Sequence, residues 1–320
     1  MKNFIKKVFI SFKLGDKYLE HIKKAVPYAQ VLCGPIEDNL HELQNTEVLV
    51  TFGTDLTDEN LKKCANLKWL HLFSAGLDTL PIESLKNWDI LVTNSRGIHA
   101  IPMAEHTIAA ILNFCRQSQE FFKNQQQKKW DRSIRMTEAY EKVLGIIGVG
   151  AIGSCIANRA KALGMNVLGV NTTGDNVEYV DKMYTIYNLH QMLHQCDFVV
   201  MVLPFTSKTY KVFGESEFKC MRNTAYFINI SRGQVVDQDA LIRSLKEKWI
   251  AGAALDVFAD EPLPDHSPLW SMDNVMITPH TSGWSDKYMI RAVDILLQNM
   301  YNYQSRQANL INHVNLKREY

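Results

Sequence analysis

The sequence predicts an α/β protein with two doubly wound parallel sheets, one in each of two domains. Short apolar runs alternate with helical patterns from end to end, which is typical of parallel strands joined by helices. The 320 residues also exceed the size of one ordinary core, so two domains are expected. In addition, the apolar run 143–147 leads through closely spaced glycines into a helical pattern, which is how such a sheet begins.

Five apolar runs predict the first sheet, and the amphipathic stretches 16–25 and 58–65 predict helices that cover it. The expected strands lie near 7–11, 30–33, 47–51, 69–73 and 90–93.

A long helical pattern follows, from 99 to about 127. Its apolar residues recur at helical spacing, so we expect it to contact both the other domain and a second subunit. These residues are Ile101, Ala104, Ile108, Ile111 and Leu112. A polar stretch, 125–135, then leads to the second sheet.

Seven further runs predict the second sheet, and a last helical pattern covers 285–303. The expected strands lie near 143–147, 166–170, 183–186, 198–203, 225–230, 251–255 and 275–277. The position of the last pattern suggests that the chain crosses back to the first domain, with a cleft between the two domains. We therefore expect one domain of 1–98 plus 286–320 and another of 99–285.

Composition excludes several classes of function. The chain has 35 Lys and Arg against 34 Asp and Glu, so it lacks the basic excess that drives nucleic-acid or anionic-membrane binding. We expect no signal peptide and no membrane span. The six cysteines show no C-x-x-C spacing, which favours reduced, buried thiols in a cytoplasmic protein without a metal site.

The glycines after the first strand of the second sheet match the G-x-G-x-x-G fingerprint of a Rossmann-like domain. Gly148 permits a tight turn, Gly150 lets the backbone approach a pyrophosphate, and Gly153 allows the next helix to pack on the strand. The start of that helix, at Ala151 and Ile152, then faces the anion. A purely structural turn between strand and helix is the alternative.

Three ionisable residues stand at strand ends of the second sheet, where open α/β sheets bind ligands. Arg232 offers a planar, two-pronged contact to a carboxylate, although it could also be a surface arginine. Glu261 next to His280 would make an imidazole that donates a proton near neutral pH. Taken singly, His280 could be a structural histidine and Glu261 a solvated carboxylate.

Four segments resemble the D-isomer-specific 2-hydroxyacid dehydrogenases, in particular their short members such as the glyoxylate/hydroxypyruvate reductases. They are 145–153, 229–233, 255–264 and 274–280. Upstream, 74–78 (Ser-Ala-Gly-Leu-Asp) resembles the family's carboxylate-binding loop, and 94–97 with 104–106 resemble its hinge and following helix. The resemblance covers nearly the whole chain, with flavodoxin-like topology as a variant of the doubly wound sheet.

The resemblance implies a role for each matching residue. Arg232 contacts the substrate carboxylate and carbonyl, His280 transfers the proton, and Glu261 tunes His280. The backbone N–H groups of Gly76 and Leu77 bind the substrate carboxylate, which makes 1–98 plus 286–320 the substrate-binding domain and 99–285 the dinucleotide-binding domain. Asp256 is implied as a partner of the nicotinamide carboxamide. The remaining implied cofactor contacts are Leu203, Pro204, Thr209, Ile230 and Ser231.

The implied reaction moves a hydride from a nicotinamide cofactor to C2 of a small 2-oxo acid while His280 donates a proton, and the reverse reaction oxidises a D-2-hydroxy acid. The implied assembly is a homodimer through the dinucleotide-binding domains. A second hypothesis is a dinucleotide-sensing corepressor or scaffold on the same fold.

The chain departs from the usual NAD site at the end of the second strand, where an acid normally accepts the ribose hydroxyls. Asn171, Thr172 and Thr173 stand there instead and could donate hydrogen bonds to a 2′-phosphate. We therefore favour NADP(H), with NAD(H) still possible because the usual arginine is missing. Related formate dehydrogenases carry glutamine at the position of Glu261, so formate is not the expected substrate. Phe73, Leu77 and Trp284 are candidate pocket residues, although Trp284 could simply pack.

Overall fold

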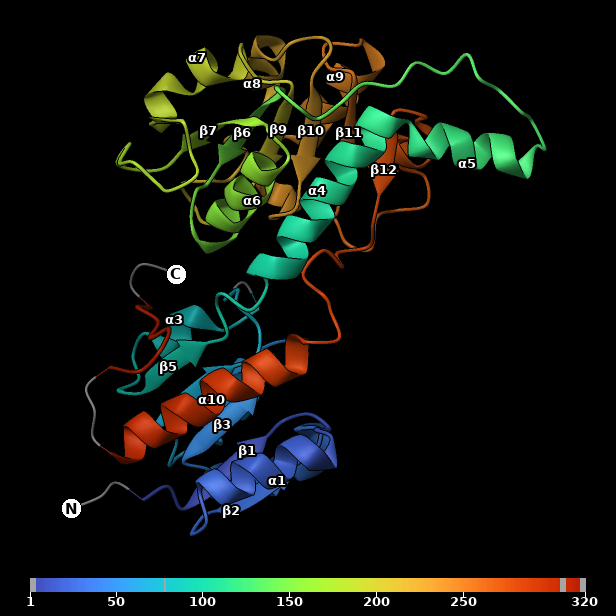
Figure 1. Ribbon diagram of the computed structural model, residues 1–320. Helices are drawn as coiled ribbons and strands as arrows, with labels where there is room; N and C mark the ends of the chain where they lie inside the picture. Colours follow the sequence, from blue (N-terminus) through green and yellow to red (C-terminus); the bar gives the residue numbers. More distant parts are fainter. Residues whose placement is uncertain (1–3, 78, 306–308, 317–320) are drawn as a thin grey trace. The chain divides into compact units, whose positions relative to one another are not determined.

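The computed structural model describes residues 4–77, 79–305 and 309–316 (Figure 1). The chain forms two compact units. The first runs to Ile98 and resumes at Ser285, and the second extends from His99 to Trp284. Each unit contains one parallel sheet, so the predicted fold class is confirmed.

The first unit contains a five-stranded parallel sheet of order β2-β1-β3-β4-β5. This is the flavodoxin-like order, in which the direction of winding reverses between β1 and β3. Its strands are β1 (Lys7–Ile10), β2 (Gln30–Cys33), β3 (Val48–Thr51), β4 (Trp69–Leu72) and β5 (Leu91–Asn94). Its helices are α1 (Asp16–Ala25), η1 (Glu37–Asn45), α2 (Asp58–Leu61), α3 (Ile82–Leu85) and α10 (Tyr288–Gln304).

Helices α1 and α10 lie side by side on one face of this sheet (Figure 1). Ile22 of α1 and Leu296 of α10 are fully buried against Val8 and Val50 of the strands. A second apolar cluster, around Leu49 and the short helices, covers the other face. The last helix therefore completes the core of the first unit, which explains why the chain returns to it.

The second unit contains a seven-stranded parallel sheet of order β12-β11-β10-β9-β6-β7-β8. The winding reverses between β6 and β9, as in a Rossmann-like sheet. Its strands are β6 (Val143–Ile147), β7 (Asn166–Val170), β8 (Lys182–Tyr184), β9 (Phe198–Met201), β10 (Tyr226–Asn229), β11 (Gly252–Leu255) and β12 (Val275–Ile277). Its helices are α4 (Ala100–Arg116), α5 (Ser118–Gln126), α6 (Ala151–Ala162), η2 (Ile186–Asn188), α7 (Leu189–Leu193), α8 (Glu215–Cys220), η3 (Gly233–Val235), α9 (Gln238–Lys246) and η4 (Pro268–Ser271).

Helices α4 and α6 share one face of the second sheet, while α7, α8 and α9 contribute to the core on the other face. The expected single helix from 99 to about 127 is wrong. Gln117 adopts a left-handed conformation with φ of 55° and separates α4 from α5. Its side chain bonds to the Phe114 carbonyl at 2.8 Å. Within α4, Ala104 and Ile111 are buried, but Ile101 and Leu112 are exposed and lie outside the core.

Within the described ranges, no helix combines the length and apolar character that a membrane crossing requires. The six cysteines are free thiols. Cys64, Cys115 and Cys196 are buried as expected, whereas Cys33, Cys155 and Cys220 are partly exposed, so the expectation of burial is wrong for these three.

Candidate active site

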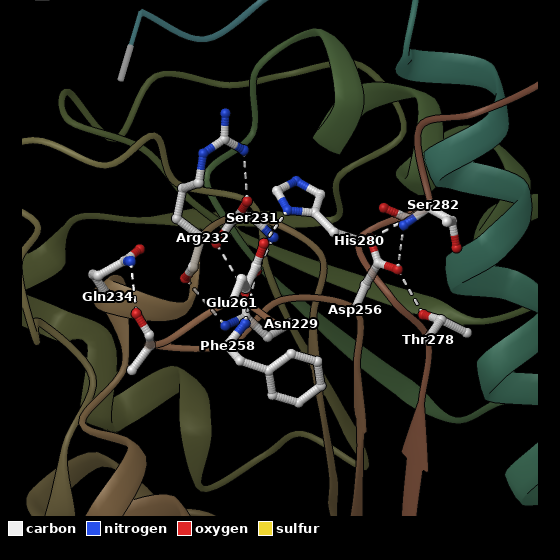
Figure 2. Close-up of polar contacts among 12 residues, drawn as sticks. Asn229, Ser231, Arg232, Gln234, Asp256, Phe258, Glu261, Thr278, His280 and Ser282 are labelled. Atoms are coloured by element: carbon white, nitrogen blue, oxygen red, sulfur yellow. Dashed lines mark hydrogen bonds and ion pairs between the residues drawn. The ribbon is translucent and has the colours of Figure 1, made fainter. Parts of the chain in front are cut away.

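The carboxyl ends of β10, β11 and β12 bring together the three ionisable residues singled out in the sequence (Figure 2). Parallel strands in register place their ends at one edge of a sheet, so residues far apart in the chain meet there. Arg232 follows β10, Glu261 lies in the loop after β11, and His280 follows β12.

His280 and Glu261 are in direct contact. The Nδ1 atom of His280 lies 2.7 Å from Oε2 of Glu261, and the two side chains are 46% and 35% exposed. The other oxygen of Glu261 accepts a hydrogen bond from the Phe258 N–H at 3.0 Å, which fixes the carboxylate. Nδ1 is therefore occupied, and Nε2 is the ring nitrogen that can exchange a proton with a ligand.

Arg232 stands in a turn with little freedom. Its Nη1 donates to the Ser231 carbonyl at 2.8 Å, and Asn229 bonds to the backbone of both Ser231 and Arg232. The next residue has to be glycine, because a Cβ at Gly233 would lie 1.8 Å from the carbonyl carbon of Phe258. The Arg232 turn thus lies directly against the loop that carries Glu261.

Asp256, at the end of β11, is only 1% exposed, and its carboxylate accepts three hydrogen bonds from the loop that contains His280. Burial raises the pKa of this carboxyl group, but hydrogen bonds from Ser282 and Thr278 outweigh it, so the pKa lies below its ordinary value. The carboxylate is therefore charged and already engaged within the protein. Its implied contact with the nicotinamide stays a prediction.

Two histidines that were not expected in the site also lie near this edge: His99, just before α4, and His106, within it. Burial and the charge of Arg232 together lower the pKa of His99 to about 4. A Cβ at Gly283 would lie 2.8 Å from the His99 ring. Burial also lowers the pKa of His106, and the charge of Asp256 opposes that change. The sequence feature that could have indicated them is their spacing of seven residues, which places both side chains on one face of a helix.

The glycine turn at the end of β6 fits a dinucleotide. Gly148 has a φ of 105°, and a Cβ at Gly153 would lie 2.4 Å from the Gly148 carbonyl oxygen. Gly150 is different, because a Cβ there would meet no protein atom within 4 Å. Its missing side chain leaves open space in front of the N-terminus of α6, at the exposed Ala151 and half-buried Ile152. Backbone approach to a phosphate explains such a glycine.

The loop after β9 lies beside this turn. The Leu203 side chain would be 3.2 Å from a Cβ at Gly148. The Thr209 hydroxyl donates to the Pro204 carbonyl at 2.7 Å and accepts from the Thr206 N–H at 2.8 Å, which fixes the loop. Ile230, also an expected cofactor contact, is 2% exposed and packs in the core; Ser231 is 6% exposed.

Asn171, the first residue after β7, makes hydrogen bonds within the loop that follows this strand. Oδ1 of Asn171 accepts from the backbone N–H groups of Thr173 and Gly174 at 3.2 and 2.5 Å, and Nδ2 donates to the Asp175 carbonyl at 3.2 Å. One N–H of the Asn171 amide is therefore used inside the loop. Thr172 and Thr173 are exposed.

The expected carboxylate-binding loop follows β4 in the first unit. The Ser74 hydroxyl donates to the Gly76 carbonyl at 3.2 Å, and the Asn94 amide of β5 donates to the Ala75 carbonyl at 2.8 Å. Leu77 is buried, and the adjoining Asp78 lies outside the described residues. Of the expected pocket residues, Phe73 is fully buried and Trp284 is 73% exposed.

Comparisons with known proteins agree with this geometry. The family model described as "D-isomer specific 2-hydroxyacid dehydrogenase, NAD binding domain" matches residues 108–282. The glyoxylate reductase of Korarchaeum cryptofilum is 32% identical over 288 residues, which are 85% of this chain and 85% of that protein. The glyoxylate reductase of Thermococcus litoralis is 32% identical and covers 96% of each chain.

A solved structure of a D-isomer specific 2-hydroxyacid dehydrogenase family protein from Aeromonas salmonicida superposes with a TM-score of 0.89 at 29% identity, over 98% of this chain and 99% of that one. The alignment thus extends through both units. The chain belongs to the D-isomer specific 2-hydroxyacid dehydrogenases, NAD(P)-dependent oxidoreductases that interconvert 2-hydroxy and 2-oxo acids.

Proposed function

We propose that this enzyme reduces a small 2-oxo acid, with glyoxylate as the first candidate, and uses NADPH in preference to NADH. The observation that carries the proposal is the contact between His280 and Glu261 at 2.7 Å, at the same sheet edge as Arg232. An imidazole with one nitrogen on a carboxylate and the other directed to a ligand is a proton donor for an alkoxide. The names of the curated relatives supply glyoxylate as the candidate.

Each group in the site has a distinct task. A dinucleotide held at the glycine turn 148–153 would supply the hydride for C2 of the 2-oxo acid. His280 donates its Nε2 proton to the oxygen that becomes the hydroxyl, while Glu261 stabilises the imidazolium and fixes the ring. Arg232 binds the substrate carboxylate and stabilises the charge that develops on the carbonyl oxygen. In the reverse direction, neutral His280 accepts the proton of a D-2-hydroxy acid.

In this proposal each unit binds a different molecule. The first unit binds the substrate carboxylate through the backbone N–H groups of Gly76 and Leu77. The second unit binds the dinucleotide through the glycine turn 148–153 and the loops at 171–173 and 203–209. The open space at Gly150 supports the second assignment.

NADPH is preferred in this proposal because no carboxylate stands at position 171 to repel a 2′-phosphate. The exposed hydroxyl of Thr172 and the second N–H of Asn171 are available as donors, whereas the Thr173 hydroxyl already donates to Oδ1 of Asn171 at 3.5 Å. Among similar solved structures, the NADPH-dependent glyoxylate/hydroxypyruvate reductase of Sinorhizobium meliloti was determined with NADP, at 25% identity, a TM-score of 0.84, and coverage of 98% of this chain and 100% of that one.

The enzyme is also proposed to be a cytoplasmic homodimer. Large apolar side chains are exposed on α5 and on the segment that follows it, notably Phe122 at 66% and Trp130 at 91%. Exposed apolar surface of this kind is typical of a protein interface. The six free thiols fit a reducing compartment. The comparisons give no support to a sensing corepressor or scaffold.

A panel of 2-oxo acids tests the function directly. The enzyme is assayed with glyoxylate, hydroxypyruvate, pyruvate and phenylpyruvate, each with NADPH and with NADH, and kcat/KM is compared across the panel. We expect the highest value for glyoxylate or hydroxypyruvate with NADPH. Absence of turnover with every acid and both cofactors would contradict the proposal.

A further inference from the structure

His280 has a backbone conformation that residues with a side chain rarely adopt. Its φ is 53°, in the left-handed region that glycine and asparagine favour. A residue remains in such a conformation only where its surroundings fix it. Contacts around the 278–282 loop therefore have to determine where the imidazole points.

Asp256 supplies those contacts (Figure 2). Its Oδ1 accepts hydrogen bonds from the Thr278 hydroxyl at 2.6 Å and from the Thr281 N–H at 2.9 Å. Its Oδ2 accepts from the Ser282 N–H at 3.0 Å. Its backbone carbonyl accepts from the N–H of His280 itself at 2.8 Å. One residue thus bonds to the loop before, at and after His280.

The burial of Asp256 makes these hydrogen bonds necessary in the folded protein. The residue is 1% exposed, and a buried carboxylate is costly unless hydrogen bonds satisfy it. In the part of the chain that the structure describes, every side-chain hydrogen bond of Asp256 goes to this loop. Its charge is therefore compensated by the segment that presents His280.

We propose that Asp256 is a positioning residue, which holds the 278–282 loop so that the His280 ring stays in contact with Glu261. It acts on the reaction through His280, and this role does not depend on a contact with the nicotinamide. The effect on turnover rests on the proposed function, whereas the effect on the loop does not depend on any substrate.

Asp256→Asn tests the proposal, because the amide has nearly the same size but loses one acceptor and presents an N–H to donors. Three quantities are measured: amide hydrogen exchange of a peptide covering 278–284 without ligands, kcat and KM for glyoxylate, and the Kd of NADPH by fluorescence. We expect exchange to be about tenfold faster. Turnover should fall on the order of a hundredfold, as for a misplaced reacting group, with the Kd changed less than about threefold.

Two further variants serve as controls. Thr278→Val removes one of the three side-chain bonds and keeps the branched shape, so it should change exchange and kcat in the same direction but less. Asp260→Asn makes the same charge change at an exposed position of the neighbouring loop. All three measured quantities should stay at their wild-type values in this variant.

Unchanged exchange in the 278–284 peptide of Asp256→Asn would overturn the proposal. An increase in the Kd of NADPH beyond about tenfold without faster exchange would also overturn it, since the carboxylate would then act on the cofactor itself. If Asp256→Asn does not fold, Thr278→Val decides by the same criteria. If the wild-type enzyme reduces no 2-oxo acid, the proposed function fails, and the exchange measurement still tests the loop.

Discussion

His280 follows the last strand of one sheet, whereas His71 lies within a strand of the other sheet. The first side chain is partly exposed and the second is buried. His280 lies beyond the end of β12, partly exposed and in contact with Glu261. His71 lies within β4 and is fully buried. Its Nδ1 bonds to the Thr93 hydroxyl at 2.7 Å, and its Nε2 is buried without a hydrogen-bond partner among the described residues.

This difference determines what each imidazole can do. Burial lowers the pKa of His71 to about 3, so it stays neutral over the physiological range and serves as a packing residue between Trp69 and Phe73. His280 has a carboxylate partner at Nδ1 and a partly exposed ring, so a ligand can reach its other nitrogen. A histidine becomes useful for proton transfer through its position at a sheet edge next to an acid.

The strongest test of this comparison removes the imidazole at the sheet edge. His280→Ala should lower kcat on the order of 10² to 10⁴-fold, because the proton donor is lost, while the Kd of NADPH stays within about threefold. Steady-state kinetics and fluorescence titration measure the two quantities. Turnover within about threefold of wild type would show that another group donates the proton.

The buried histidine should affect stability instead of turnover. The folded-state pKa of His71 lies below its value in the unfolded chain, so the unfolded state binds more protons between pH 6.5 and 3, and stability falls as pH falls through that range. Between pH 7 and 4 the loss should be about 3 kcal/mol. Denaturant unfolding of wild type and His71→Gln at both pH values isolates this contribution. Equal pH dependence in the two proteins would contradict it.

A charge placed after β7, at the same carboxyl edge of the second sheet, sharpens the comparison. Asn171→Asp should shift the preference towards NADH by roughly 1 to 3 kcal/mol, because a carboxylate accepts from the ribose hydroxyls and repels a 2′-phosphate. The ratio of kcat/KM for NADPH and NADH is measured in both proteins. If the wild type already strongly prefers NADH, a group other than Asn171 binds the ribose.

The smallest expected effect concerns the partner of His280. Glu261→Gln should lower kcat roughly fivefold, since a neutral amide makes a weaker hydrogen bond to the His280 ring than the carboxylate does. Steady-state kinetics with glyoxylate and NADPH measure kcat in both proteins. A kcat equal to that of the wild type would mean that the contact with Glu261 contributes nothing to turnover.

The sequence was most informative where one local pattern determines one structure. Apolar runs predicted strands such as 143–147, 166–170 and 275–277 with the bounds that the structure has, because most residues of a strand in a parallel sheet are covered and apolar. The break at Gln117 was not predictable, since glutamine carries no local signal for a left-handed conformation. The break leaves two helices, α4 of 17 residues and α5 of 9 residues, in place of one.

The sequence predicted which residues form the site but not which other residues contact and orient them. Arg232, Glu261 and His280 were found because each stands at a strand end. The hydrogen bonds of Asp256 and the approach of His99 to Arg232 depend on which segments of the folded chain meet. A sequence pattern of single elements contains no such information.

Gly233 has a consequence for the redesign of this enzyme. Because any side chain at this position would collide with the backbone of Phe258, the Arg232 turn and the Glu261 loop fit together as one backbone unit. A library that varies 231–234 alone should return glycine at 233 in nearly every active clone. New specificities at this edge therefore have to be sought by exchanging both segments together, taken from one parent enzyme.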